Sequence, residues 1–225
     1  MPSVLFVFSS AAPQGWYLPE AAHPYYVLAP HATIDFTSPN GANPPVNEGS
    51  VQMYEKDQES VKFLADETVK AKLANAKKLS EVSAKDYDAI YYIGGHGPVF
   101  DLAVDPENIK LGNEGSNFFF YQSGKIVSAV CHGLAALVGV TDAQGKSIFA
   151  GKNVTGFSNV EEEILGTTKE IPFSTEDRIV SLGGKYTTAD KPYEPKVVVD
   201  GLLLTGQNPG SSSPLGEEIL KALQK

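Results

Sequence analysis

Short apolar runs alternate along the chain with segments whose apolar residues recur at helical spacing. The runs are rich in β-branched and aromatic residues and are bounded by turn-forming residues, which is typical of buried strands. They lie at Ser3–Ser9, Ala32–Thr37, Asp86–Ile93, Lys125–Val130, Val154–Phe157 and Val197–Leu204. Strands that alternate with helices build a mostly parallel sheet covered on both faces, so the pattern predicts an α/β fold.

The segments between these runs carry the signals of helices. The first predicted helix has Pro19 in its first turn, where the missing amide proton of proline costs nothing. Further helices are predicted at Ser60–Leu79, Ser116–Gln122, Gly133–Val140 and Leu215–Leu223.

Two stretches interrupt the alternation and are predicted to be insertions on one core. The first, residues 38–60, begins with a long run rich in proline, asparagine and glycine, and the second is residues 170–194. Loops of this length usually cover or serve a site. No linker or shift in composition marks a boundary, so the 225 residues are expected to form a single domain.

Charge and cysteine usage narrow the classes of partner. The net charge is −9 and the isoelectric point about 4.9, which argues against nucleic acid and against an anionic membrane surface. The first residues lack the positive region of a secretion signal, and no apolar run is long enough to span a bilayer. One cysteine forms no intrachain disulfide. We therefore expect a cytoplasmic protein, with the nucleus as a second location.

That single cysteine stands between a predicted strand and a predicted helix, in the sequence Ala-Val-Cys131-His132-Gly133. A nucleophile at the tip of a strand-to-helix turn forms a nucleophile elbow. The amides and dipole of the helix start are expected to lower the pKa of the thiol. The amide of His132 is also placed to donate to an oxyanion on a substrate carbonyl. The alternative is that Cys131 is a small buried apolar residue.

A second glycine-rich turn, Gly94-Gly95-His96-Gly97-Pro98, follows another predicted strand. In open α/β sheets ligands bind beyond the carboxyl ends of the strands, so this turn and the Cys131 turn are expected to share a crevice. The amide of Gly95 can approach a bound oxygen because no Cβ stands in the way. For His96 the alternative is an ordinary surface histidine. A nucleotide-binding loop is disfavoured, since its glycine and lysine signatures are missing.

Glu20 follows the first predicted strand and comes after Trp16 and Tyr17. A carboxyl group in apolar surroundings has a raised pKa and can transfer protons near neutrality. The alternative is an ordinary glutamate at a helix start, where the helix dipole favours negative charge.

Glu161, Glu162 and Glu163 follow the strand that ends at Phe157, and one of them is expected to orient His132. The alternative is a solvated helix start with Asn159 as its N-cap. Local sequence does not select among the three. No metal site is expected, because the four histidines lack the spacing of metal ligands and no second cysteine exists.

In combination, the segments GWYLPEAAHP, GGHGP and AVCHG and the glutamate cluster closely resemble the PfpI-type superfamily. Within it they resemble the heat-shock protein 31-like branch, the glutathione-independent glyoxalases (glyoxalase III) of fungi. The resemblance runs in order over nearly the whole chain. It implies a flavodoxin-like three-layer sandwich with small cap insertions, a homodimer and no cofactor. Leu134, where the family commonly has proline, and residues 40–49 depart from the pattern and put substrate preference in doubt.

The resemblance also implies an activity and its residues. Methylglyoxal, a small 2-oxoaldehyde, would be converted to D-lactate by Cys131, His132 and Glu20, with Glu163 as the best match for the third member of the triad and Gly95 near the oxyanion. Binding of misfolded client proteins and a stress role often accompany this chemistry. The alternatives are a PfpI-type cysteine peptidase and a chaperone or cysteine redox sensor without significant catalysis. A glutamine amidotransferase is disfavoured, because its histidine lies far from its cysteine in sequence.

Overall fold

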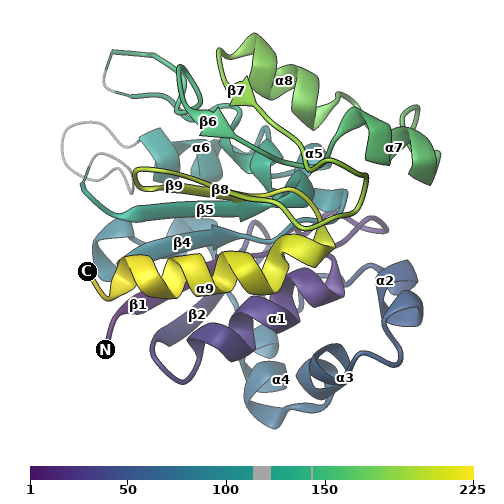
Figure 1. The fold of residues 1–225 in the computed structure, drawn as a ribbon. Coiled ribbons are helices and arrows are strands. Elements are labelled where there is room, and N and C mark those ends of the chain that lie inside the picture. The colour runs from purple at the N-terminus through teal and green to yellow at the C-terminus, as the bar shows by residue number, and fades with distance from the viewer. Residues whose placement is uncertain (114–122, 143) are drawn as a thin grey trace.

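The computed structural model describes residues 1–113, 123–142 and 144–225, and a seven-stranded sheet forms the centre of this part (Figure 1). The strand order is β3-β2-β1-β4-β5-β9-β8. Neighbouring strands are parallel except for β8 and β9, which are antiparallel. The strands are β1 (Ser3–Val7), β2 (Thr33–Ser38), β3 (Lys77–Lys78), β4 (Ala89–Tyr92), β5 (Ile126–Val130), β8 (Val197–Asp200) and β9 (Leu203–Gly206). A separate small sheet pairs β6 (Asn153–Val154) with β7 (Lys185–Tyr186).

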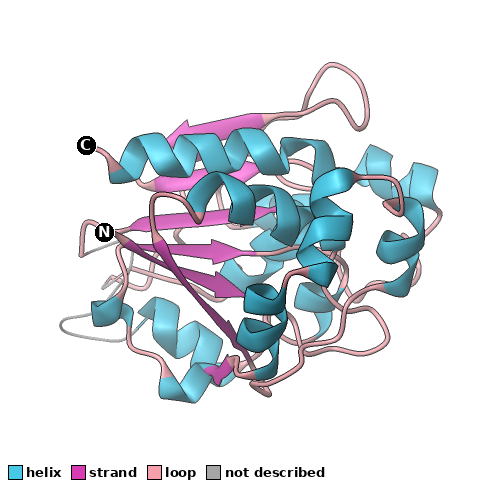
Figure 2. Cartoon of the chain, turned by 90° about the horizontal axis from the view of Figure 1, so that it is seen from below, coloured by secondary structure: helices cyan, strands magenta, loops and turns pink. Residues whose placement is uncertain are grey.

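Helices cover both faces of the central sheet, as Figures 1 and 2 show. The helices are α1 (Leu18–Leu28), α2 (Glu48–Met53), α3 (Gln58–Ala65), α4 (Glu67–Ala74), α5 (Gly97–Phe100), α6 (Pro106–Asn113), α7 (Asn159–Leu165), α8 (Thr175–Ser181) and α9 (Ser212–Leu223). Short 3-10 helices occur at Leu79–Glu81, Ala84–Asp86, Cys131–Leu137 and Pro209–Ser211. The predicted α/β sandwich with a mostly parallel sheet is confirmed.

The two faces of the sheet are buried in two separate apolar cores. Along β1, Val4 and Phe6 belong to the core under α1 and α9, whereas Leu5 and Val7 belong to the core on the other face. All four side chains are 0% exposed. A strand buried on both faces needs apolar residues at every position, which explains the continuous run that the sequence shows.

The predicted strands agree with the structure better in their positions than in their lengths. The run Val197–Leu204 is not one strand but the hairpin of β8 and β9, which turns at Gly201 with a φ of 64°. The predicted strand Val154–Phe157 is only β6, and it lies outside the central sheet. The edge strand β3 was not predicted, because two lysines carry no apolar pattern.

Two predicted helices also differ from the structure. The segment Ser60–Leu79 contains α3 and α4, which are separated at Asp66, and it ends in β3. Asp66 accepts hydrogen bonds from the amides of Thr68 and Val69 and so begins a new helix. The predicted helix Gly133–Val140 is a 3-10 helix that begins at Cys131 itself. The helix predicted at 116–122 lies outside the described residues.

The order of the strands fixes where a ligand can bind. The chain proceeds from β1 to β2 and β3 on one side, then returns to β4 and β5 on the other side. The order therefore reverses between β1 and β4, and the segments that follow these strands diverge there and leave a crevice at the carboxyl edge. Within the described residues, no helix is long and apolar enough to cross a membrane.

Candidate active site

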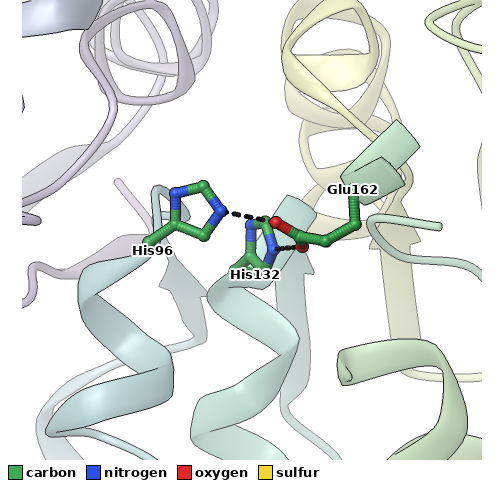
Figure 3. A group of neighbouring side chains, drawn as sticks. All are labelled: His96, His132 and Glu162. Atoms are coloured by element: carbon green, nitrogen blue, oxygen red, sulfur yellow. Dashed lines mark hydrogen bonds and ion pairs between the residues drawn. The ribbon is translucent and has the colours of Figure 1, made fainter. Parts of the chain in front are cut away.

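A cavity of about 310 Å³ opens at this carboxyl edge, and three segments bring Glu20, His96, Cys131 and His132 into its lining. Glu20 comes from the first turn of α1, His96 from the turn after β4, and Cys131 with His132 from the turn after β5. Glu162, on α7, forms hydrogen bonds with both histidines (Figure 3). The glycine turn and the cysteine turn share one crevice, as predicted, and Glu20 lines the same cavity.

Cys131 stands at a strained backbone position directly after β5. Its φ is 57°, a left-handed conformation that costs a non-glycine residue on the order of 1–3 kcal/mol. Gly133 makes the turn possible, because a Cβ there would lie 2.5 Å from the carbonyl oxygen of Tyr92. This geometry is the nucleophile elbow that the sequence predicted, with a 3-10 helix in place of the α-helix.

His132 links the thiol to a carboxylate. Its Nδ1 lies 3.3 Å from Cys131 Sγ, and its Nε2 lies 2.6 Å from Glu162 Oε2. Burial lowers the pKa of His132 and outweighs the hydrogen bond to Glu162, which acts in the opposite direction. A neutral His132 that donates from Nε2 to Glu162 presents an unprotonated Nδ1 to the thiol. The three side chains thus form a nucleophile, a base and an orienting acid.

The orienting acid is Glu162, so the prediction of Glu163 is wrong. Glu162 is buried, whereas Glu163 is exposed on the outer side of α7. Glu163 was only the best match of the resemblance, and local sequence did not select among the three glutamates. Ser158, not Asn159, is the N-cap, and it forms a capping box with Glu161. This cap fixes the rotation of α7, so that Glu161 and Glu162 are buried and Glu163 is exposed to solvent.

Glu162 is held by more partners than the sequence indicated. His96 Nε2 lies 2.9 Å from Glu162 Oε1, and the hydroxyl of Thr167 donates to the same oxygen. Burial acts to raise the pKa of Glu162, but the hydrogen bonds from His132, His96 and Thr167 hold it well below its usual range. His96 is therefore not the ordinary surface histidine of the alternative interpretation. No sequence signal pointed to Thr167.

Glu20 is a buried acid beside the nucleophile. It is 0% exposed, which excludes the interpretation as a solvated helix-start glutamate. Among the described residues, neither carboxyl oxygen has a hydrogen-bond partner of standard geometry. Burial raises the pKa of Glu20 to about 8, against smaller lowering effects of the Cys131 thiol and the amides of Gly94 and Gly95. The close approach requires glycine, since a Cβ on Gly94 would lie 2.4 Å from Glu20 Oε2.

The thiol itself is not a stabilised thiolate, and the expected lowering of its pKa is wrong. Burial raises the pKa of Cys131, and the Glu20 carboxylate raises it further. The amides of His132 and Gly95 act in the opposite direction but do not prevail. Because Glu20 is mostly protonated below about pH 8, the thiol faces a neutral acid near neutrality. Nucleophilic attack at this site therefore needs a base, and His132 Nδ1 is in position.

His96, His132 and Glu162 are also a group whose ligand atoms lie within 4.8 Å of one another. Two imidazoles and a carboxylate are a donor set that suits zinc or iron. In the present arrangement both Nε2 atoms are hydrogen-bonded to Glu162, so a metal would have to replace both contacts. The absence of a metal stays a prediction.

The chain is similar in sequence and in structure to known proteins. A model of the DJ-1/PfpI family matches residues 20–222. The chain is 30% identical over 224 residues to the Saccharomyces cerevisiae protein named glutathione-independent glyoxalase HSP31, covering 96% of this chain and 92% of that one. The structure of Rapid Encystment Protein from Francisella tularensis superposes with a TM-score of 0.90 at 36% identity, covering 99% of each chain. Glyoxalase III from Candida albicans superposes with a TM-score of 0.85 at 26% identity, covering 98% of this chain and 97% of that one.

Proposed function

Because the chain belongs to the DJ-1/PfpI family, we propose that it is a glutathione-independent glyoxalase that converts a 2-oxoaldehyde such as methylglyoxal into D-lactate. The observation that carries the proposal is the contact of Cys131 Sγ with His132 Nδ1 at 3.3 Å, beside the buried acid Glu20. The names of the yeast relative and of the Candida structure support the same reaction.

In the first step the thiol adds to the aldehyde carbon. His132 Nδ1 accepts the thiol proton, and Glu162 stabilises the imidazolium that forms. The oxyanion on the former aldehyde is stabilised by the amides of Gly95 and His132, which point toward the sulfur. Protonated Glu20 then gives its proton to this oxygen, so that the product is a neutral hemithioacetal.

In the second step Glu20 acts as a base. Its carboxylate removes the proton from the former aldehyde carbon, and protonated His132 gives its proton to the ketone oxygen, so that an enediol forms. Glu20 then gives its proton to the neighbouring carbon and takes up the proton of the hydroxyl on the former aldehyde carbon, which leaves a lactoyl thioester on Cys131. Water, activated by His132, releases D-lactate and restores the thiol. A carboxyl group whose pKa is about 8 suits both roles, since acid and base forms are both accessible near neutrality.

The decisive experiment follows methylglyoxal consumption together with chiral detection of lactate, in the absence of glutathione. Wild type is expected to form D-lactate, and Cys131→Ala is expected to form none above the uncatalysed rate. Lactate formation by Cys131→Ala at the wild-type rate would refute the mechanism.

The same triad is compatible with attack on an amide, which leaves a cysteine peptidase as the competing enzyme class. Hydrolysis of casein that requires Cys131 would favour the peptidase. A redox sensor would instead show reversible oxidation of Cys131 without turnover.

The remaining expectations are part of the proposal. We propose that the protein is a homodimer in the cytoplasm, and also in the nucleus, and that it binds misfolded client proteins under stress. Light scattering tests the dimer, and localisation of the tagged chain in cells tests the compartment. Suppression of client aggregation by Cys131→Ala would place the chaperone activity on a different surface from the thiol.

A further inference from the structure

The cavity around Cys131 is much larger than methylglyoxal requires. Its volume is about 310 Å³, at the lower end of the range of roughly 300–1,000 Å³ in which proteins bury drug-sized ligands. Methylglyoxal, the smallest ketoaldehyde, carries only a methyl group on its ketone. A methyl group leaves most of this space to water, so the cavity suits a bulkier substituent.

Most of the walls of this cavity are apolar and aromatic. Tyr17 and Tyr54 meet edge to face with ring centroids 5.9 Å apart, and Phe157 and Tyr193 meet at 6.2 Å. Met53 and Leu165 also line the cavity. Among the described residues that line it there is no lysine and no arginine, so these residues offer an anionic substituent no such counter-charge.

Two of the three tyrosine hydroxyls at this cavity, those of Tyr17 and Tyr193, have hydrogen-bond partners within the protein. The hydroxyl of Tyr17 donates to Met53 Sδ at 3.3 Å, and that of Tyr193 donates to the backbone oxygen of Glu161 at 3.1 Å. Since both hydroxyls already have partners, a ligand would contact the aromatic rings of Tyr17 and Tyr193. Aromatic rings of a ligand pack on such walls in offset or edge-to-face geometry.

Both predicted insertions contribute to these walls. Met53 and Tyr54 come from residues 38–60, and Tyr193 comes from residues 170–194. Figure 1 shows α2, which lies within residues 38–60, at the end of the molecule beyond the carboxyl ends of β4 and β5. The core loops thus carry the reactive groups, whereas the insertions shape the space beside them.

Tyr193 is fixed in place at a cost. Its φ is 63°, in the left-handed region that a tyrosine rarely adopts. Its amide donates to Glu161 Oε1 at 2.8 Å, and Asn208 Nδ2 donates to the same oxygen. Glu161 is 0% exposed, whereas Tyr193 is 42% exposed. A strained residue persists only where its surroundings hold it, and such strain concentrates at ligand-binding sites.

We propose that this enzyme prefers 2-oxoaldehydes whose ketone carries an aromatic or branched apolar group over methylglyoxal, and that Tyr193, held by Glu161, forms the wall on which this group packs. The inference rests on the proposed function and adds a substrate class to it. The chemistry is unchanged: the aldehyde carbon is oxidised to the carboxylate level, the ketone carbon is reduced to the alcohol, and one water molecule is added. Phenylglyoxal is the probe, and mandelate is its product.

The experiment compares kcat/KM for phenylglyoxal and methylglyoxal by chiral detection of mandelate and lactate. For wild type, the ratio is expected to favour phenylglyoxal by on the order of 10-fold, because burying a ring gains more than burying a methyl group. Tyr193→Ala is expected to reduce this ratio by about 10-fold. Tyr193→Phe keeps the ring and is expected to keep the ratio.

Two controls accompany these variants. Val180→Ala removes an exposed apolar side chain on α8 that does not line the cavity, and it is expected to leave both rates unchanged. Phenylglyoxal modifies arginine side chains, and Arg178 is the only arginine of the chain. Arg178→Lys is expected to keep the wild-type rates with both substrates, which excludes arginine modification as a cause of altered rates.

The possible results separate the two proposals. A wild type that turns over methylglyoxal as well as or better than phenylglyoxal overturns the preference but leaves the glyoxalase intact. An equal effect of Tyr193→Ala on both substrates overturns the role of Tyr193. A wild type that converts neither substrate refutes the proposed function and the preference together.

Discussion

At the residue scale, Glu20 combines complete burial with the lack of a standard hydrogen-bond partner for its carboxyl oxygens among the described residues. Its pKa rises from 4.5 to about 8. The folded state therefore keeps a proton that the unfolded chain releases, and stability falls as the pH rises through this window.

We predict that the stability of the Glu20→Gln variant does not show this fall with rising pH. Between about pH 5 and about pH 9 the free energy of unfolding of wild type should fall relative to the variant by a few kcal/mol, at about 1.4 kcal/mol per pKa unit. Urea titrations of both proteins at the two pH values measure the difference. If the free energies of unfolding of wild type and Glu20→Gln differed by the same amount throughout this range, Glu20 would already be ionised in the folded protein at about pH 5.

Glu162 and Glu163 provide a matched pair of substitutions one residue apart. Glu162→Gln removes the charge that orients and stabilises protonated His132, so kcat is expected to fall by about 10²–10⁴-fold. Glu163→Gln changes an exposed side chain and should keep kcat within about 2-fold of wild type. The assay is D-lactate formation, and equal losses in the two variants would contradict the assignment of the triad.

At the scale of elements, capping residues decide where helices begin. The helix boundaries predicted from apolar periodicity differ from the structure at such caps. Asp66 interrupts a continuous apolar periodicity because its side chain accepts from the amides of Thr68 and Val69. Asp66→Ala is expected to cost about 1 kcal/mol and to lower the melting temperature by roughly 2–4 °C. Asp66→Asn keeps the acceptor and should lose less, and calorimetry distinguishes the two. Activity should not change, since α4 does not line the cavity.

At the scale of the whole molecule, catalysis depends on groups from separate segments that the strand order brings together. Protonated Glu20 and neutral His132 are both needed for the first step, so kcat/KM is expected to have a bell-shaped pH dependence. The alkaline limb should fall above about pH 8, as Glu20 ionises. The acid limb should lie below pH 6.5, because burial lowers the pKa of His132. Initial rates across this range measure both limbs, and a profile that keeps rising above pH 8 would exclude protonated Glu20 as the acid.

The sequence by itself determined the layers of the fold and the position of the nucleophile. Strands buried on both faces must be apolar throughout. A single cysteine that follows such a strand and is close to a glycine is therefore placed in the turn at the carboxyl edge of the sheet. These features depend on local composition and on the rule that loops at the carboxyl ends of parallel strands converge.

Only the tertiary structure decided which acid faces His132, the direction of the pKa shift of Cys131, and the walls of the cavity. Three successive glutamates are equivalent until the helix cap fixes their rotation about α7. The pKa of a thiol depends on burial and on Glu20, which is remote in sequence. Tyr193 reaches the cavity only because Glu161 and Asn208 hold its loop. Each of these outcomes depends on contacts between distant segments, which local periodicity does not record.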